Sequence, residues 1–355
     1  MGVSETGEPE GNPPEPVSDD PARANAPPVA GPGPVDEAAP AEANRFAGCH
    51  VLSMSQYDRL DLALLFAEAD AAAAGLAAGR LTGRGAERPL AGRLMVSAFF
   101  ERSTRTRLAH EAAMLRLGGA VIGFAEASVT RSGGRTGESD DDIARMLSLY
   151  GDVVVVRHSA TDWSKQVARA SHGALFINAG DGVGEHPTQA LVDLYSMWQR
   201  FGTLDGLRIL LVNDLRTRCV HSLLAGLSHF DCEVYAVRAD GAGVRDEPAP
   251  AGAPAIIFCE DVAEVLSKVD VVYSSPTVSA NPDGGQEAAD QLLGVNLDRR
   301  LLEAHANEHL TVLHPLPRKG ELATDLDDSR FNGYWAQSAN GITVRMALLK
   351  LMFGS

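Results

Sequence analysis

Short apolar runs alternate with longer amphipathic stretches along most of this 355-residue chain. The runs have the length of buried strands and are bounded by glycine, proline and polar residues, so they predict β-strands. The stretches between them repeat their apolar residues with helical spacing, as Leu191, Leu194, Tyr195 and Trp198 do. The predicted strands are 94–100, 121–124, 153–156, 175–178, 209–212, 233–237, 256–258, 271–273 and 310–313.

This alternation predicts an α/β fold of two doubly wound parallel-sheet domains joined by helices, with both faces of each sheet covered. A break at 201–206, after a long helix, marks the passage between the two domains. We assign residues 46–190, completed by a C-terminal helix at 340–355, to a first domain and residues 191–339 to a second.

The first 45 residues have a different composition. They hold ten of the 19 prolines, nine acidic residues and two arginines, with almost no large apolar side chains. Such a segment cannot bury enough apolar surface to offset the entropy of ordering its chain. We therefore expect a disordered acidic tail at 1–45 and a globular chain from about Phe46.

The formal charge of −16 opposes attraction to nucleic-acid phosphates and to anionic membranes. No apolar run approaches the roughly 20 residues of a membrane-spanning helix, and the start of the chain lacks the pattern of a signal peptide. The four cysteines are far apart, which argues against a disulfide framework or a zinc site and favours buried thiols. We expect a cytoplasmic protein with neither nucleic acid nor membrane as a partner.

The first candidate site for chemistry follows the predicted strand 94–100, where Ser103, Thr104, Arg105 and Thr106 begin a helical pattern. Hydroxyls, a guanidinium and the free N–H groups of a helix N-terminus converge there, which is how proteins hold a phosphate without a metal. The alternative is a capped helix with solvated arginines.

Two further candidates also follow predicted strands. Arg157 comes directly after the run 153–156, and His186 caps a helix whose first residue is Pro187, with Gln189 in its first turn. Ligands of open α/β sheets bind beyond the carboxyl ends of the strands, where these side chains are expected. They suit a cationic contact, a polarising imidazole and an amide that can hydrogen-bond a small polar ligand. The alternatives are a surface charge and a capping histidine.

The fourth candidate is the loop 314–321, His-Pro-Leu-Pro-Arg-Lys-Gly-Glu, after the last predicted strand. Its prolines, Pro315 and Pro317, hold the backbone extended and leave carbonyl groups without helical partners. Such carbonyls suit the hydrogens of an NH2 group.

These four motifs, in this order and spacing, resemble those of the aspartate/ornithine carbamoyltransferase family, from about Phe46 to the C-terminus. Thr188 in His-Pro-Thr-Gln and the later loop His-Pro-Leu-Pro-Arg look like the aspartate branch, since the ornithine branch typically has a cysteine in each of these places. The resemblance implies an enzyme that moves the carbamoyl group of carbamoyl phosphate to a small amine without metal, cofactor or covalent intermediate.

The resemblance also implies a role for each matching residue. Ser103, Thr104, Arg105, Thr106 and Arg157 would bind the phosphate. Thr106, Arg157 and His186 would polarise the carbonyl oxygen, and Gln189 with the backbone carbonyls of Leu316 and Pro317 would hold the carbamoyl nitrogen. The implied catalytic residues are Arg105, Thr106, Arg157, His186 and Gln189.

The family is built on trimers in which a loop of the neighbouring subunit completes each site. The matching loop is 130–139, so Ser132 and Arg135 are expected to reach carbamoyl phosphate in a homotrimer with shared active sites. The aspartate branch has a lysine where this chain has Thr136, and Arg135 lies one position earlier. Arginine and lysine differ in shape, so this change is not neutral.

The acceptor side departs most from the aspartate branch. That branch has Arg-x-Gln after its late strand to hold the side-chain carboxylate of aspartate, whereas this chain continues through 274–278 without an arginine. A buried carboxylate without a cation is destabilised, so the acceptor is expected to be aspartate or, given these altered residues, a different amine such as 2,3-diaminopropionate, whose cationic side chain would meet Glu321 or nearby acids. The residues expected at the acceptor are Arg218, Leu316, Thr277 and Glu321.

Two other functions stay open on sequence alone. A catalytically inactive relative, used as a binding or regulatory protein, would account for the altered acceptor residues, although decay would not spare the donor motifs selectively. A dinucleotide-dependent dehydrogenase fits two α/β domains, but no Gly-x-Gly-x-x-Gly follows a suitable strand.

Overall fold

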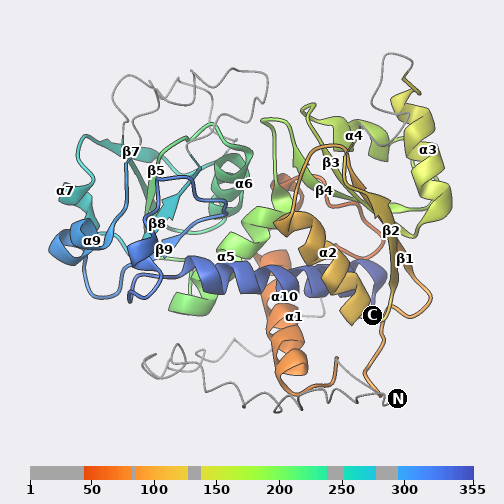
Figure 1. Cartoon of the computed structure of the whole chain (residues 1–355), viewed down its shortest axis with the longest axis horizontal. Coiled ribbons are helices and arrows are strands. Elements are labelled where there is room, and N and C mark those ends of the chain that lie inside the picture. The colour runs from red at the N-terminus through yellow and green to blue at the C-terminus, as the bar shows by residue number, and fades with distance from the viewer. Residues whose placement is uncertain (1–43, 82–84, 127–136, 238–251, 277–294) are drawn as a thin grey trace, which may run out of the picture. The chain divides into compact units, whose positions relative to one another are not determined.

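The computed structural model describes residues 44–81, 85–126, 137–237, 252–276 and 295–355. Figure 1 shows these residues as helices arranged around two separate sheets. The acidic segment at 1–45 lies outside the described residues, except for its last two positions. Phe46 is already fully buried in an apolar core.

The apolar runs of the first half form a parallel sheet in the order β2-β1-β3-β4. Its strands are β1 (Leu94–Phe99), β2 (Ala120–Phe124), β3 (Val153–His158) and β4 (Leu175–Asp181). β3 extends beyond the predicted run and contains Arg157, which was expected to follow the strand. The reason is that the backbone of Arg157 still pairs with Phe99 of β1.

The runs of the second half form a parallel sheet in the order β7-β6-β5-β8-β9. Its strands are β5 (Arg208–Val212), β6 (Glu233–Val237), β7 (Ile256–Cys259), β8 (Val271–Ser274) and β9 (Thr311–Leu313). All nine predicted strands are therefore confirmed, and both sheets are parallel as expected.

Helices connect the strands. Those described are α1 (Arg59–Ala77), α2 (Arg105–Arg116), α3 (Asp140–Tyr150), α4 (Trp163–Ala168), α5 (Pro187–Phe201), α6 (Arg218–Leu227), α7 (Ala263–Leu266), α9 (Arg299–His305) and α10 (Tyr334–Phe353), with short 3-10 helices at Met54–Gln56 and Thr324–Leu326.

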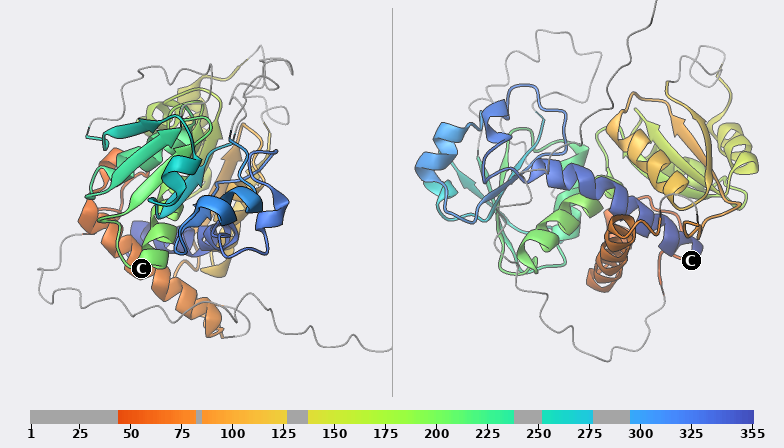
Figure 2. Two further views of the ribbon diagram at one scale, coloured as in Figure 1. Left: turned by 90° about the vertical axis from the view of Figure 1, so that its left-hand side faces the viewer. Right: turned by 60° about the horizontal axis from the view of Figure 1, so that its bottom comes forward.

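Alternate residues of each strand pack into different cores. In β3, Val153 and Val155 belong to the core formed with α1, α2, α5 and α10, whereas Val154 and Val156 pack with α3 and α4. The strands of the second sheet divide between two cores in the same way. Strands buried on both faces require continuous apolar runs, and the predicted coverage of both faces is confirmed (Figure 2).

The C-terminal helix begins earlier than predicted, at Tyr334 rather than at 340, and ends at Phe353. Its first residues had been expected to lie outside the helix, but Tyr334 is buried in the core of the second sheet and so starts the helix there. A Cβ on the preceding Gly333 would lie 2.4 Å from Oγ1 of Thr311 in β9, so glycine allows the close approach. α10 then packs along α5, α1 and α2 (Figure 1).

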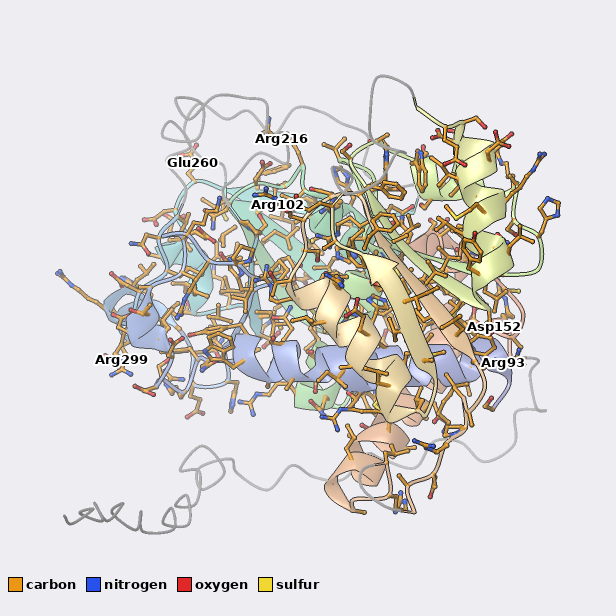
Figure 3. The ribbon with its side chains drawn as sticks, turned by 45° about the vertical axis from the view of Figure 1, so that its right-hand side comes forward. Arg93, Arg102, Asp152, Arg216, Glu260 and Arg299 are labelled. Carbon is orange, nitrogen blue, oxygen red and sulfur yellow. The ribbon has the colours of Figure 1, made fainter. Side chains whose placement is uncertain are left out.

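An ion pair fixes the amino ends of β1 and β3. Arg93 Nη1 lies 2.9 Å from one oxygen of Asp152, whose other oxygen accepts the N–H of Leu94 at 2.8 Å. Figure 3 labels this pair near one end of β1, away from Arg102, which follows the strand's carboxyl end. The carboxyl ends are therefore the ends from which the sequence motifs extend.

The cysteines are all free, as expected. The expectation of buried thiols is wrong for Cys49, which is exposed, whereas Cys219, Cys232 and Cys259 are partly buried. Cys232 and Cys259 pack at the edges of the apolar cores. No helix in the described part of the chain is long and apolar enough to cross a membrane.

Candidate active site

The carboxyl ends of strands from both sheets line a cavity of about 850 Å³. The first sheet contributes residues 101–106 and Arg157, the start of α5 contributes His186 and Gln189, and the region of the second sheet contributes residues 217–219, Pro276 and 314–317. The four sequence motifs therefore meet in one place, as the rule for open α/β sheets predicts.

The N-terminus of α2 forms one wall of the cavity. Ser103, Thr104, Arg105 and Thr106 all line it. Thr104 occupies the N-cap position but makes no side-chain capping bond, so the alternative of an ordinary capped helix is not observed. The first N–H groups of a helix have no intrahelical acceptor and attract an anion, which leaves this end suited to a phosphate.

Arg157, Thr106 and His186 form a buried cluster at the back of this wall. One guanidinium nitrogen, Nη2 of Arg157, donates to Thr106 Oγ1 at 2.9 Å and lies 2.9 Å from His186 Nε2. Arg157 Nε donates to the carbonyl of Ala179 in β4 at 2.8 Å, which fixes the plane of the guanidinium. Three residues from separate segments thus converge on one point.

The protonation of His186 follows from its partners. Because a guanidinium only donates, Nε2 accepts from Arg157 and the proton resides on Nδ1, 3.4 Å from Thr188 Oγ1. Burial and the nearby Arg157 and Arg218 hold the pKa of His186 well below its usual range, so the imidazole is neutral. Burial also lowers the pKa of Arg157 to about 9, at which it stays charged at neutral pH.

Gly180 allows two arginines to approach each other at the end of β4. Its φ is +116°, and a Cβ there would lie 3.0 Å from the guanidinium carbon of Arg218 and 3.3 Å from Arg157 Nε. Arg218 in turn donates to Glu101 Oε2 at 3.1 Å and to the carbonyl of Gly182 at 3.2 Å. Glycine is required at position 180 both for the backbone conformation and for the space.

Gln189 lies in the first turn of α5 and lines the cavity. Its Nε2 donates to Oδ1 of the buried Asp193 at 2.7 Å. Burial raises the pKa of Asp193 to about 6, against the lowering effect of hydrogen bonds from Gln337, Gln189 and Tyr273. Asp193 was not predicted as a site residue, because in the sequence it is one polar residue within a largely apolar helix.

A buried hydrogen-bonded pair, His314 and Glu321, fixes the conformation of the loop 314–321 after β9. His314 Nε2 lies 2.9 Å from Glu321 Oε1, and His314 Nδ1 accepts the N–H of Leu316 at 2.7 Å. Leu316 has a φ of +55° and is followed by a cis bond to Pro317, and both residues line the cavity.

The prediction that Glu321 faces the acceptor requires correction. Its side chain is buried, its carboxylate bonds His314 and the N–H of Lys319, and it lies outside the lining of the cavity. The carboxylate supports the loop and is not placed to meet an amine. The other predicted acceptor residues that the structure describes, Arg218 and Leu316, do line the cavity.

The cavity is strongly cationic although the whole chain is acidic. Of the described residues that line it, six are cationic and one, Glu101, is acidic. The cations are Arg102, Arg105, Arg157, Arg218, Lys319 and Arg345. This concentration suits a small, highly charged anion.

Arg345 was missed from the sequence. It lies on α10, is 3% exposed, and donates to the carbonyl of Gly341 and to His110. The available indication was an arginine inside an apolar helical run, since buried arginines are rare without a function or a partner. Ser132, Arg135 and Thr277, by contrast, were predicted for the site but lie outside the described residues.

Two family models match the chain. One, described as "Aspartate/ornithine carbamoyltransferase, carbamoyl-P binding domain", matches residues 49–199, and the other, its "Asp/Orn binding domain", matches residues 205–352. The chain belongs to the aspartate/ornithine carbamoyltransferase family. This membership excludes the dehydrogenase alternative.

Relatives place this carbamoyltransferase with the aspartate type. The aspartate carbamoyltransferase catalytic subunit of Picrophilus torridus is 36% identical over 306 residues, covering 86% of this chain and 98% of the relative. That of Pyrobaculum neutrophilum is 40% identical over 270 residues, covering 75% and 88%. The chain is an aspartate carbamoyltransferase-like enzyme, and these relatives give no support to an inactive protein.

Solved structures agree with this assignment. Aspartate transcarbamoylase from Trypanosoma cruzi in complex with carbamoyl phosphate and aspartate superposes with a TM-score of 0.76 at 33% identity, covering 87% of this chain and 97% of that one. The same enzyme with N-(phosphonacetyl)-L-aspartic acid gives a TM-score of 0.74 at 32% identity, covering 86% and 96%.

Replacing Gly180 by alanine tests the arrangement of the two arginines. The new Cβ would push Arg218 and Arg157 apart, so we expect the Kd for inorganic phosphate, measured by calorimetry, to rise at least about tenfold, or about 1.4 kcal/mol. Gly206→Ala is the matched control, because Gly206 also has a positive φ, +78°, but has nothing within 4 Å of the added Cβ. Equal phosphate affinity in both variants would contradict the assigned role of Gly180.

Proposed function

We propose that the chain transfers the carbamoyl group of carbamoyl phosphate to the α-amino group of aspartate and releases phosphate. The observation that carries the proposal is the contact of Arg157 with Thr106 and His186 at the N-terminus of α2.

The phosphate would bind at the start of α2. Ser103, Thr104, Arg105 and Thr106 offer hydroxyls, a guanidinium and helix N–H groups, and Arg157 adds a second cation. Guanidinium–phosphate pairs are charge-assisted and directional, so they fix the orientation of the donor as well as its affinity. Ser132 and Arg135 of a neighbouring subunit would complete this part of the site.

The carbonyl oxygen would then lie at the buried cluster. Thr106 and Arg157 donate hydrogen bonds to it. When the substrate oxygen replaces His186 Nε2 as the acceptor from Arg157, the proton of the neutral imidazole can move to Nε2, and His186 then donates to the substrate as well. These donors stabilise the negative charge that develops as the amine attacks carbon. The C–O bond to phosphate breaks, and the departing phosphate accepts the proton of the amine.

The acceptor would enter from the side of the second sheet. Arg218 holds its α-carboxylate, and the carbonyls of Leu316 and Pro317 orient the carbamoyl nitrogen. Glu321 bonds His314 and the N–H of Lys319 within its loop, so it gives no support to a cationic acceptor such as 2,3-diaminopropionate. Lys319 and Arg102 also line the cavity and favour an acceptor with a second carboxylate, as aspartate has.

A comparison of acceptors tests the proposed substrate. Initial rates of carbamoyl transfer should give the highest kcat/KM with aspartate, compared with ornithine, 2,3-diaminopropionate and simple amines, because the lining is cationic. A higher kcat/KM with 2,3-diaminopropionate would reject aspartate as the acceptor. Phosphate release that no amine accelerates would reject carbamoyl transfer itself.

Thr106→Ala tests the role of the hydroxyl in the cluster. We expect kcat/KM to fall about 100-fold, near 3 kcal/mol, because a donor to the developing oxyanion is lost. Ser148→Ala is the control, since Ser148 is also buried but its hydroxyl bonds only Ala144 within α3. A Thr106 variant as active as the Ser148 variant would remove Thr106 from the mechanism.

The homotrimer with shared sites is part of the proposal, as is a cytoplasmic location. A single chain leaves Leu108 and Leu115 of α2 and Ile122 of the edge strand β2 about half exposed, which favours burial of this face against another subunit. Sedimentation equilibrium should therefore give three times the chain mass of 37.5 kDa. A fully active species at the mass of one chain would contradict sites shared between subunits.

A further inference from the structure

Asp193 is the centre of a buried hydrogen-bond network behind the cavity. Its Oδ1 accepts from Gln189 Nε2 at 2.7 Å and from Gln337 Nε2 at 2.6 Å, and its Oδ2 accepts from the Tyr273 hydroxyl at 2.8 Å. The three partners come from α5, α10 and β8, and Asp193 itself is fully buried. Gln189 and Gln337 also line the cavity.

The ends of the two amide groups are determined by their partners. An ionised carboxylate only accepts hydrogen bonds, so each glutamine must direct its NH2 end to Asp193. Gln337 confirms this independently, because its other end, Oε1, accepts the backbone N–H of His314 at 2.8 Å. In Gln189 the NH2 end is thus directed to Asp193, and the oxygen is the end left for a ligand.

We propose that Asp193 is a positioning residue that holds the amide oxygen of Gln189 toward the substrate and so makes the site select a carbamoyl group. The inference rests on the proposed function and extends it to the choice of donor. An amide oxygen accepts a hydrogen bond from the NH2 of carbamoyl phosphate. It has no such bond with the methyl group of acetyl phosphate, which has nearly the same shape.

Without the carboxylate, this selectivity would be lost. Asparagine at position 193 offers both an oxygen and an NH2 group, so Gln189 can turn over and present its own NH2 to the ligand. The NH2 group of Gln189 then faces the NH2 group of carbamoyl phosphate, and the preference for carbamoyl over acetyl phosphate falls. Binding of the phosphate end is unaffected, because Gln189 is not among the groups at the start of α2.

The test is a double-mutant cycle with Asp193→Asn, Gln189→Ala and the combined variant. Calorimetry would give the Kd values for carbamoyl phosphate, acetyl phosphate and inorganic phosphate with each full-length protein. We expect Asp193→Asn to reduce the carbamoyl-to-acetyl preference about tenfold, while the Kd for inorganic phosphate changes less than about twofold. In the Gln189→Ala background the same change should alter the preference less than about threefold.

Two outcomes overturn the inference. The first is an unchanged preference in Asp193→Asn, and the second is a loss that persists in full without Gln189, since Asp193 would then act by another route. A wild-type protein that does not bind carbamoyl phosphate would instead reject the proposed function, so the two failures are distinguishable. Tyr273→Phe is the matched control, because it removes one bond to Asp193 and leaves the contact with Gln189 intact.

A titration of the wild-type protein gives the same answer should the Asp193 variant not fold. Asp193, whose pKa is raised to about 6, gains a proton between pH 7 and pH 5.5 and can then donate, so the preference should fall over this range. Of the other groups facing it, Tyr273 and Cys219 stay neutral, Arg345 stays charged and His186 stays neutral. The two acyl phosphates have similar phosphate ionisation, which cancels in the ratio. A flat ratio across this range would overturn the inference.

Discussion

The contact of the Arg157 guanidinium with Thr106 and His186 is the interaction on which the site depends. It joins β3, the first turn of α2 and the cap of α5, which are far apart in the chain. All three residues are buried, so little solvent is present to weaken the electrostatic interactions among them. The parallel sheet makes this possible, because it brings the carboxyl ends of its strands to one edge.

Burial also explains why an acidic protein can hold an acidic substrate. The surface charge is screened by solvent and salt over roughly 10 Å, whereas the cations of the cavity act at contact distance in a less polar medium. Burial lowers the pKa of Arg157 to about 9, and burial together with the nearby arginines holds the pKa of His186 well below its usual range, so the cluster consists of one charged guanidinium and one neutral imidazole. An incoming oxyanion relieves the unfavourable placement of the cation in this site.

The fold and most of the donor site could be predicted from the sequence because both depend on local patterns. The nine strands are apolar runs, and residues 103–106, Arg157 and His186 lie near the carboxyl ends of three of them. Residues whose role depends on distant packing could not be predicted. Asp193 bonds Tyr273 and Gln337, and Glu321 bonds His314, and the sequence does not reveal these contacts.

The most direct measurement is a crystal structure of the full chain with phosphonoacetamide, a stable mimic of carbamoyl phosphate. The account predicts the phosphonate at the first turn of α2 and the carbonyl oxygen about 2.7–3.1 Å from Thr106 Oγ1, Arg157 and His186 Nε2. It also predicts the amide nitrogen next to the side-chain oxygen of Gln189. A ligand bound in the cavity with its carbonyl directed away from Arg157 and His186 would contradict the account.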